Sequence, residues 1–214
     1  MSLKKHLQKH NFTYFISNLF SHNKISNGVK KTFEIGKFVS LKRCNVFGLS
    51  HNKIIIGEHS TLHNVSICIK GNNNIIRICE NNEITDSEIV IVGNNCLIEI
   101  GKKCSIHNSR LYCGDYDKSL KIGDDCLIGF GTTIMTYDAH SIFNINGEKI
   151  NQAGNILICN HVWLASNVTV LCGAVINENS VGGAGSFLKN KTIPSGSIFV
   201  GNGRIIKTNI NWDR

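Results

Sequence analysis

The chain has 214 residues, 42% of them hydrophobic, and a formal net charge of +8. This length suits one domain or one solenoid with short appendages, and the hydrophobic share is sufficient for a core. No run of about 18 apolar residues exists, so we expect no membrane-spanning helix. The N-terminus lacks the apolar core and cleavage site of a secretion signal, which predicts a cytoplasmic protein.

The nine cysteines have no C-x-x-C spacing, so we expect buried free thiols rather than disulfides or a metal site. The basic charge could attract nucleic acid, a membrane surface or an anionic substrate. No helix-turn-helix, zinc-finger or RNA-binding signature accompanies it. We therefore expect no nucleic acid partner.

Residues 3–20 have the apolar spacing of a short amphipathic helix, with lysines near its polar side. We assign residues 1–31 to an N-terminal cap that covers the open end of a solenoid. The alternative interpretation of this basic helix is peripheral association with an anionic membrane, at its inner face.

From about residue 32 a long period follows, because similar segments recur every 21 or 22 residues, beginning at Ile35, Ile56, Ile78, Ile100 and Ile122. A coil of three six-residue strands needs about 18 residues. Each of these coils therefore carries about four extra residues at a corner. Residues 32–207 are expected to form one continuous domain, followed by a tail at 208–214.

The second half repeats every six residues, which neither a helix nor an isolated strand explains. A parallel β-helix does, with one aliphatic and one small side chain pointing inward from each strand. The aliphatic series is Ile122, Ile128, Ile134, Ile158, Leu164, Val170, Ile176, Leu188 and Val200, with Gly182 and Pro194 in two slots. The small series is Cys126, Thr132, Val162, Val168, Ala174, Ser180, Ser186 and Thr192.

The repeat stops once, where the inward slots would be His140, Asn146 and Gln152. The same register resumes afterwards, so residues 137–155 are expected to form an extended loop that leaves the coil at a corner. A long loop on a rigid scaffold is a common place for function.

Three segments resemble the core of the hexapeptide-repeat O-acetyltransferases, namely residues 158–176, 181–194 and 201–207. The similarity is to the galactoside, maltose and surface-polysaccharide enzymes, and especially to bacterial capsule and polysialic acid O-acetyltransferases. It implies an all-β fold, a left-handed parallel β-helix, assembled as a homotrimer. It also implies acetyl-CoA as the co-substrate, no metal, and a glycan or nucleotide sugar as the acceptor.

The family's catalytic base is a loop histidine, and His140 matches its place, although Ser141 departs from the usual proline. A neutral imidazole can remove the proton of a sugar hydroxyl as that hydroxyl attacks a thioester. Asp138 or Glu148 could orient the ring. Trp163 follows an inward valine and should point outward, where it contacts substrate or anchors a subunit interface.

The resemblance also assigns the acetyl-CoA groove, which lies between adjacent subunits in the family. Main-chain contacts along the pantetheine are expected from Ala165, Ser166, Gly183 and Ala184. Phosphate contacts are expected from Lys189, Lys191 and Lys207, for which the alternative is plain solvation.

The sequence therefore predicts an acyltransferase that moves acetyl directly to a hydroxyl of a surface-glycan sugar, with an acidic sugar such as sialic acid favoured by the positive charge. One alternative is a non-catalytic β-helix that binds a partner or is structural. The other is a γ-class carbonic anhydrase, which the spacing of His59 and His63 disfavours.

Overall fold

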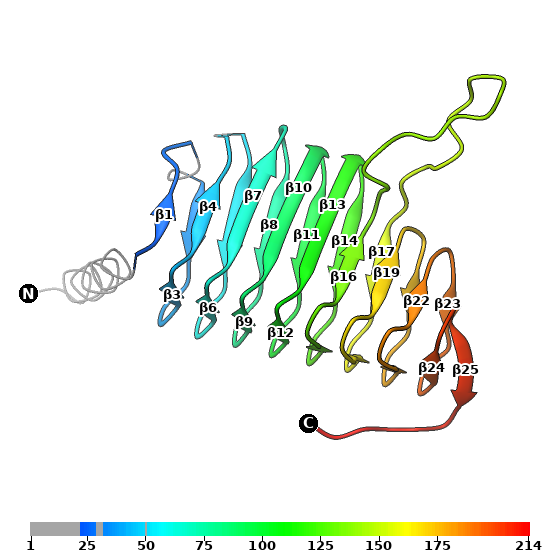
Figure 1. Cartoon of the computed structure of the whole chain (residues 1–214). Helices are drawn as coiled ribbons and strands as arrows, with labels where there is room; N and C mark the ends of the chain where they lie inside the picture. The colour runs from blue at the N-terminus through cyan, green and yellow to red at the C-terminus, as the bar shows by residue number, and fades with distance from the viewer. Residues whose placement is uncertain (1–21, 29–31, 50) are drawn as a thin grey trace, which may run out of the picture.

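The computed structural model describes residues 22–28, 32–49 and 51–214, and it is all-β in that range. The strands wind into one elongated coil, which runs from blue to red in Figure 1. The helix expected at residues 3–20 lies outside the described residues. In the described part of the chain, no helix has the length and apolarity needed to cross a membrane.

Three sheets form the walls of the coil, and successive strands of a coil belong to successive sheets. Each turn thus adds one strand to each wall, which confirms the predicted parallel β-helix. Sheet A contains β1 (Lys24–Ile25), β4 (Asn45–Phe47), β7 (Ser66–Lys70), β10 (Glu88–Asn94), β13 (Arg110–Tyr116), β16 (Thr133–Met135), β19 (Thr169–Leu171) and β22 (Phe187–Leu188). Sheet B contains β2 (Phe33–Ile35), β5 (Lys53–Ile56), β8 (Ile75–Ile78), β11 (Leu97–Ile100), β14 (Ser119–Ile122), β17 (Ile156–Ile158), β20 (Val175–Ile176) and β23 (Thr192–Ile193). Sheet C contains β3 (Ser40–Lys42), β6 (Thr61–His63), β9 (Glu83–Thr85), β12 (Ser105–His107), β15 (Leu127–Ile128), β18 (Trp163–Leu164), β21 (Val181–Gly182), β24 (Ile198–Val200) and β25 (Arg204–Lys207).

Aliphatic ladders fill the interior of the coil. In sheet B one such ladder stacks in register and is fully buried, and it consists of Ile54, Ile76, Ile98, Leu120 and Ile156. Each buried side chain of this kind stabilises the fold by about 1.5–3 kcal/mol. All nine cysteines are free thiols, and six of them share the interior as buried residues.

The inward positions predicted from the six-residue repeat are buried as far as Leu188, and then the register slips by one residue. Ile193 and Phe199 point inward, whereas Thr192, Pro194 and Val200, expected inside, do not. The corner between β22 and β23 is one residue shorter than the same corner of the preceding coil, because Leu188 pairs with Val170 and Ile193 with Ile176. In sheet C, Phe199 consequently pairs with Gly182. A Cβ at Gly182 would lie 2.6 Å from Phe199 Cζ, so the missing side chain leaves the room that the ring fills.

The extra residues of the first coils lie between sheets A and B. There they lengthen β7, β10 and β13, which have five, seven and seven residues. These coils are consequently wider than the later ones, but they belong to the same three sheets.

The corner between sheets B and C holds one residue per coil in the left-handed backbone region. We name these residues the B–C column. From His59 onward, the amide of each donates to a carbonyl of the preceding coil, as His161 does to Asp124. Most residue types pay a steric cost in this region, and Asn and Asp tolerate it best. The column consists of Phe38, His59, Asn81, Lys103, Asp125, His161 and Asn179, with φ between 55° and 61°, and Gly196 holds the equivalent place in the last coil.

One long excursion leaves the coil between β16 and β17, and it projects beyond the other corners in Figure 1. At its base the amide of Gly154 donates to the Thr136 carbonyl at 2.9 Å, so the coil closes beneath it. Leu120 and Ile156 pair directly across the interruption. The excursion therefore adds a loop without disturbing the register of sheet B.

Both ends of the described chain meet the coil. β1 lies before residue 32, where the sequence predicts the solenoid to begin, and pairs with β4. β25 pairs antiparallel with β24. Residues 208–214, named the strap below, then run back along the outside of the coil, as the red segment of Figure 1 shows. The strap starts where the Ile210 amide donates to the Gly196 carbonyl at 3.0 Å.

Candidate active site

His140 lies on the excursion, and its side chain is exposed to solvent. Its carbonyl accepts a hydrogen bond from Asn151 Nδ2 at 2.7 Å. Within the described residues, no hydrogen bond or ion pair engages the imidazole ring. The backbone at His140 is thus held while both ring nitrogens remain available to a substrate.

Asn151 joins the two limbs of the excursion. Besides the bond to His140, its Nδ2 donates to Asp138 Oδ2 at 3.1 Å. Its Oδ1 accepts the amide of Ile142 at 2.6 Å. One side chain therefore bonds to residues on both sides of His140, which fixes the path of the loop through that residue.

Asp138 connects the excursion to the coil through Lys189, whose Nζ lies 3.2 Å from Asp138 Oδ2. Lys189 follows β22, at the corner between sheets A and B. Burial raises the pKa of Asp138, but hydrogen bonds from Asn151 and Lys189 outweigh it, and the net pKa is lowered. The carboxylate is therefore ionised and committed to these two partners.

Two further contacts hold the base of the excursion. Lys149 Nζ lies 3.3 Å from Asp115 Oδ2 on β13. The ring of Tyr137 packs over Gly114, because a Cβ at Gly114 would lie 2.5 Å from Tyr137 Cε1. Burial raises the pKa of the Tyr137 hydroxyl. The excursion thus rests on the wall of the preceding coil.

Glu148, the other expected orienting group, lies at the tip of the excursion. It accepts a hydrogen bond from Asn144 Nδ2 at 2.8 Å. The Asn144 amide donates to the Glu148 carbonyl at 2.9 Å, which closes a small hairpin. Its carboxylate is therefore committed to the turn and is not bonded to His140.

Trp163 lies on a different side of the coil. It begins β18 in sheet C, just after the B–C corner, whereas the excursion leaves between sheets A and B. Its side chain points outward and is 41% exposed, as the sequence predicts for its orientation. A single chain therefore does not bring Trp163 and His140 to one place.

The residues expected along acetyl-CoA fall into separate groups. Ala165, Ser166, Gly183 and Ala184 stack on two successive coils at the corner between sheets C and A, where the Ala165 amide donates to the Gly182 carbonyl. Within the described residues, the amides of Ser166 and Ala184 donate to no protein group, so they can meet a ligand.

The three lysines lie elsewhere. Lys189 and Lys191 occupy the corner between sheets A and B, and Lys207 ends β25. Lys189 is engaged by Asp138, and Lys191 Nζ donates to the Asn202 carbonyl. Lys207 is exposed. The structure thus brings Lys189 to the excursion and leaves Lys207 apart from it.

The structure also shows groups that no sequence pattern marks. Asn151 is one of several polar loop residues, and nothing in its spacing marks it. The contacts of Trp212 and Arg214 with the B–C column depend on a return path that no local pattern encodes. Among the described residues, no three His, Cys, Asp or Glu side chains gather in a way that could hold a metal ion.

No family model matches the sequence. The fold is similar to the crystal structure of the polysialic acid O-acetyltransferase OatWY, with 30% identity, a TM-score of 0.71, and coverage of 90% of this chain and 87% of that one. It is also similar to the polySia-specific acetyltransferase NeuO, with 29% identity, a TM-score of 0.75, and coverage of 85% and 84%.

Two curated relatives match shorter segments. The polysialic acid O-acetyltransferase of Neisseria meningitidis is 46% identical over 55 residues, which are 25% of this chain and 26% of the relative. The galactoside O-acetyltransferase of Escherichia coli K12 is 36% identical over 87 residues, 40% and 41% of the two chains. The matches therefore span less than half the length of these relatives.

Proposed function

The chain belongs to the hexapeptide-repeat O-acetyltransferases, and on this premise we propose that it transfers an acetyl group from acetyl-CoA to a sugar hydroxyl of a bacterial surface glycan. Two similar proteins are named for polysialic acid, and the net charge of +8 suits an acidic acceptor. Polysialic acid or its sialic acid unit is therefore the first acceptor to test.

The observation that carries the proposal is the exposed ring of His140 on a loop whose backbone is held by Asn151. A general base needs a free ring nitrogen at a defined position. In the proposed reaction, that nitrogen accepts the proton of the sugar hydroxyl. The hydroxyl oxygen bonds to the thioester carbonyl carbon, and the carbon–sulfur bond then breaks to release the CoA thiolate, which takes up the proton.

Acetyl-CoA is the co-substrate in this proposal. The free amides of Ser166 and Ala184 lie on successive coils at one corner, where they can donate to an extended ligand. Lys189, Lys191 and Lys207 supply positive charge toward the end of the coil for phosphates. A main-chain amide can also stabilise the negative charge that develops on the carbonyl oxygen.

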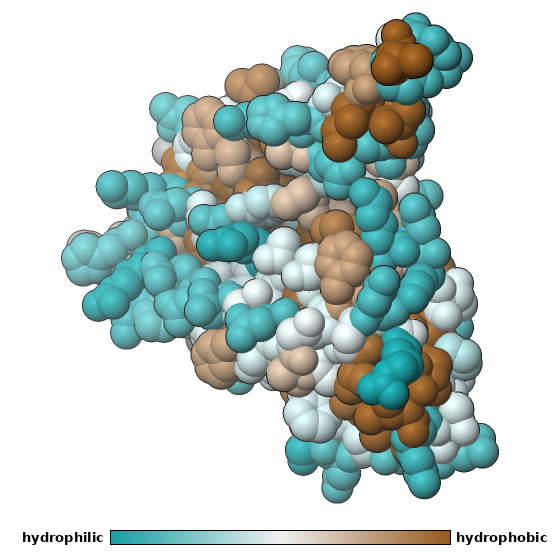
Figure 2. All heavy atoms as spheres, turned by 45° about the vertical axis from the view of Figure 1, so that its right-hand side comes forward, coloured by the Kyte–Doolittle hydropathy of each residue, from teal (hydrophilic) through white to brown (hydrophobic). Residues whose placement is uncertain are grey.

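A homotrimer supplies the remaining parts of the site. Because Trp163 and His140 lie on different sides of one coil, a substrate that meets both has to lie between two subunits. Apolar side chains gather on the excursion, at the top right of Figure 2, and such an exposed patch is typical of an interface. They are Ile142, Phe143, Ile145 and Ile150.

The direct test replaces His140 with Ala and follows acetylation of a panel of glycans and nucleotide sugars by mass spectrometry. We expect the wild-type protein to add one acetyl group to an acidic glycan. The variant should lose about 100-fold or more in turnover, as removal of a general base does. Near-normal turnover by the variant would overturn the proposal.

His51→Ala is the matched control, because His51 is also an exposed corner histidine but lies far from the excursion in the sequence. It should leave turnover unchanged. A second experiment mixes subunits that carry His140→Ala with subunits that carry Trp163→Ala. If the site is shared between subunits, the mixed assemblies regain part of the activity that each variant alone has lost.

A further inference from the structure

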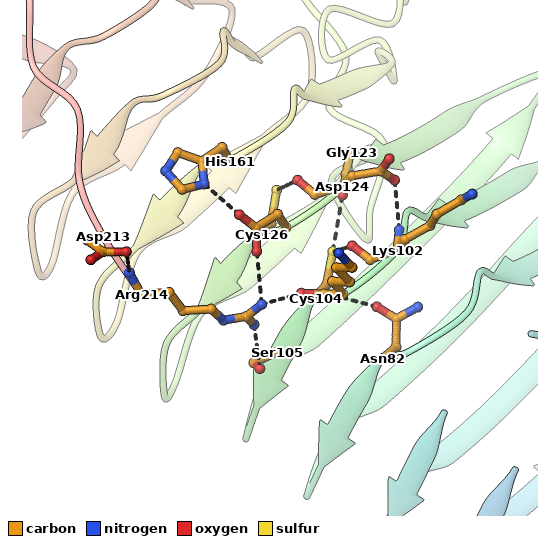
Figure 3. A network of polar contacts seen from close by, with 12 residues as sticks. Asn82, Lys102, Cys104, Ser105, Gly123, Asp124, Cys126, His161, Asp213 and Arg214 are labelled. Atoms are coloured by element: carbon orange, nitrogen blue, oxygen red, sulfur yellow. Dashed lines mark hydrogen bonds and ion pairs between the residues drawn. The ribbon is translucent and has the colours of Figure 1, made fainter. Parts of the chain in front are cut away.

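The strap crosses the B–C column from the last coil toward earlier ones. Trp212 meets His161, and Arg214 reaches the two preceding coils, where Arg214 Nη1 lies 3.0 Å from Asp125 Oδ1 and Nη2 donates to Ser105 Oγ at 2.7 Å. Figure 3 shows Arg214 and His161 converging on this corner from the strap and from the coil. The strap therefore binds three successive coils together.

His161 and Trp212 form the centre of this contact. Their rings stack with centroids 4.0 Å apart and planes 9° from parallel. Trp212 Nε1 donates to the His161 carbonyl at 2.9 Å, and His161 Nε2 lies 3.0 Å from the Trp212 carbonyl. The other ring nitrogen, Nδ1, lies 2.7 Å from Asp125 Oδ2. These contacts fix the Trp212 indole both in position and in orientation.

Trp163 lies against the outer side of this arrangement. The centroids of the Trp163 and Trp212 rings are 6.1 Å apart, and their planes are tilted by 47°. This spacing is within the range of favourable aromatic pairs. Trp163 is 41% exposed on sheet C, and its two side-chain torsion angles have several allowed rotamers. Contact with the Trp212 ring favours the rotamer that keeps the two rings together.

We propose that the strap is a positioning element for Trp163, with Trp212 as the positioning residue and His161 as the group that holds it. The inference rests on the proposed function, in which Trp163 contacts a substrate. An indole that is already fixed offers the substrate a preformed contact surface. Substrate binding then does not have to restrict the rotamers of that side chain, so less conformational entropy is lost. Trp212 itself touches no reacting atom in this proposal.

The test uses the fact that the chain has only two tryptophans. Trp212→Phe and Trp212→Ala both leave Trp163 as the single indole fluorophore, but only Phe keeps a ring that can pack against it. We expect acrylamide to quench Trp163 about twofold more strongly in the Ala variant than in the Phe variant. We expect kcat/KM for acetyl transfer to fall about three- to tenfold with Ala and to be largely restored with Phe, the range that corresponds to the energy of an aromatic pair.

Phe38→Ala, made in the Trp212→Phe background, is the matched control. Phe38 stacks on His59 with centroids 4.9 Å apart, on the same column several coils away. This control loses a similar ring contact, so it should match Trp212→Ala in stability while leaving Trp163 quenching and kcat/KM unchanged.

Equal quenching and equal kcat/KM in the two Trp212 variants would overturn the inference. So would a loss that Phe38→Ala reproduces, since that would make the strap a general stabiliser. If the wild-type protein transfers no acetyl group, the proposed function fails, but the quenching comparison still decides whether Trp212 positions Trp163.

Discussion

Asp138 and Lys189 form an ion pair with 3.2 Å between Oδ2 and Nζ, although 51 residues separate them in the chain. The pair joins the excursion that bears His140 to a coil near the far end of the solenoid. Both side chains are partly exposed, so the pair should contribute no more than about 1 kcal/mol to the free energy of unfolding. The pair matters because it fixes the position of the excursion relative to the coil.

We expect Lys189→Met to lower kcat several-fold and to leave the melting temperature almost unchanged. Methionine keeps an unbranched side chain of nearly the same length but not the charge, so the excursion loses one anchor. The measurement is steady-state kinetics of Lys189→Met, Asp138→Asn and the double variant. If the two groups act as a pair, the double variant is no slower than either single one; additive losses would contradict this.

The pH dependence of stability should report the same pair. The pKa of Asp138 is lowered in the folded protein, so its ionised form stabilises the fold. That contribution is fully present above the unfolded pKa of about 3.9 and is lost as the pH falls through the lower folded value. We expect urea unfolding to show a constant difference between wild type and Asp138→Asn above about pH 5, and a shrinking difference below it. A difference that grows as the pH falls would contradict the assignment.

Asn151→Ala should reduce kcat by about tenfold or more while KM for acetyl-CoA stays near the wild-type value, because positional errors at a catalytic group are costly. The variant removes all three bonds that hold the excursion around His140. Asn144→Ala is the control, since Asn144 bonds only within the tip of the excursion. Comparable losses in both variants would show that the loop tip matters as much as its base.

Gly182→Ala should destabilise the protein by about 1–3 kcal/mol, as overpacking of a full core does. The new Cβ would lie 2.6 Å from Phe199 Cζ and 3.0 Å from Leu164 Cδ2. The measurement is the midpoint of urea unfolding. Adding Phe199→Leu to Gly182→Ala makes room and should recover part of the loss, whereas Phe199→Leu alone should destabilise.

The interior ladders could be predicted from the sequence because each inward residue stacks on an equivalent one in the next coil. Packing then imposes a period that the chain itself displays, from Ile122 to Leu188. The slip after Leu188 could not be predicted in this way. It comes from a corner between β22 and β23 that is one residue short, and no residue class in the repeat marks where that residue is missing.

The position of His140 could be inferred because it falls where the repeat is interrupted. The groups that hold it could not. Asn151 acts through hydrogen bonds whose geometry depends on the path of the loop, and Lys189 arrives from a coil two turns further along. Trp212 contacts His161 although the two are 51 positions apart in the chain, and Trp212 is a single residue outside the repeat.

The B–C column has a consequence for how such a protein can vary. The backbone there is restricted to one conformation, yet its side chains are as different as Phe38, Lys103 and Asp125, and none of them enters the core. Successive coils are about 4.8 Å apart. The column therefore presents one variable side chain per coil at a fixed spacing, and the strap contacts three of its residues. New surface chemistry can be installed at fixed spacing along this edge while the stacked interior stays the same.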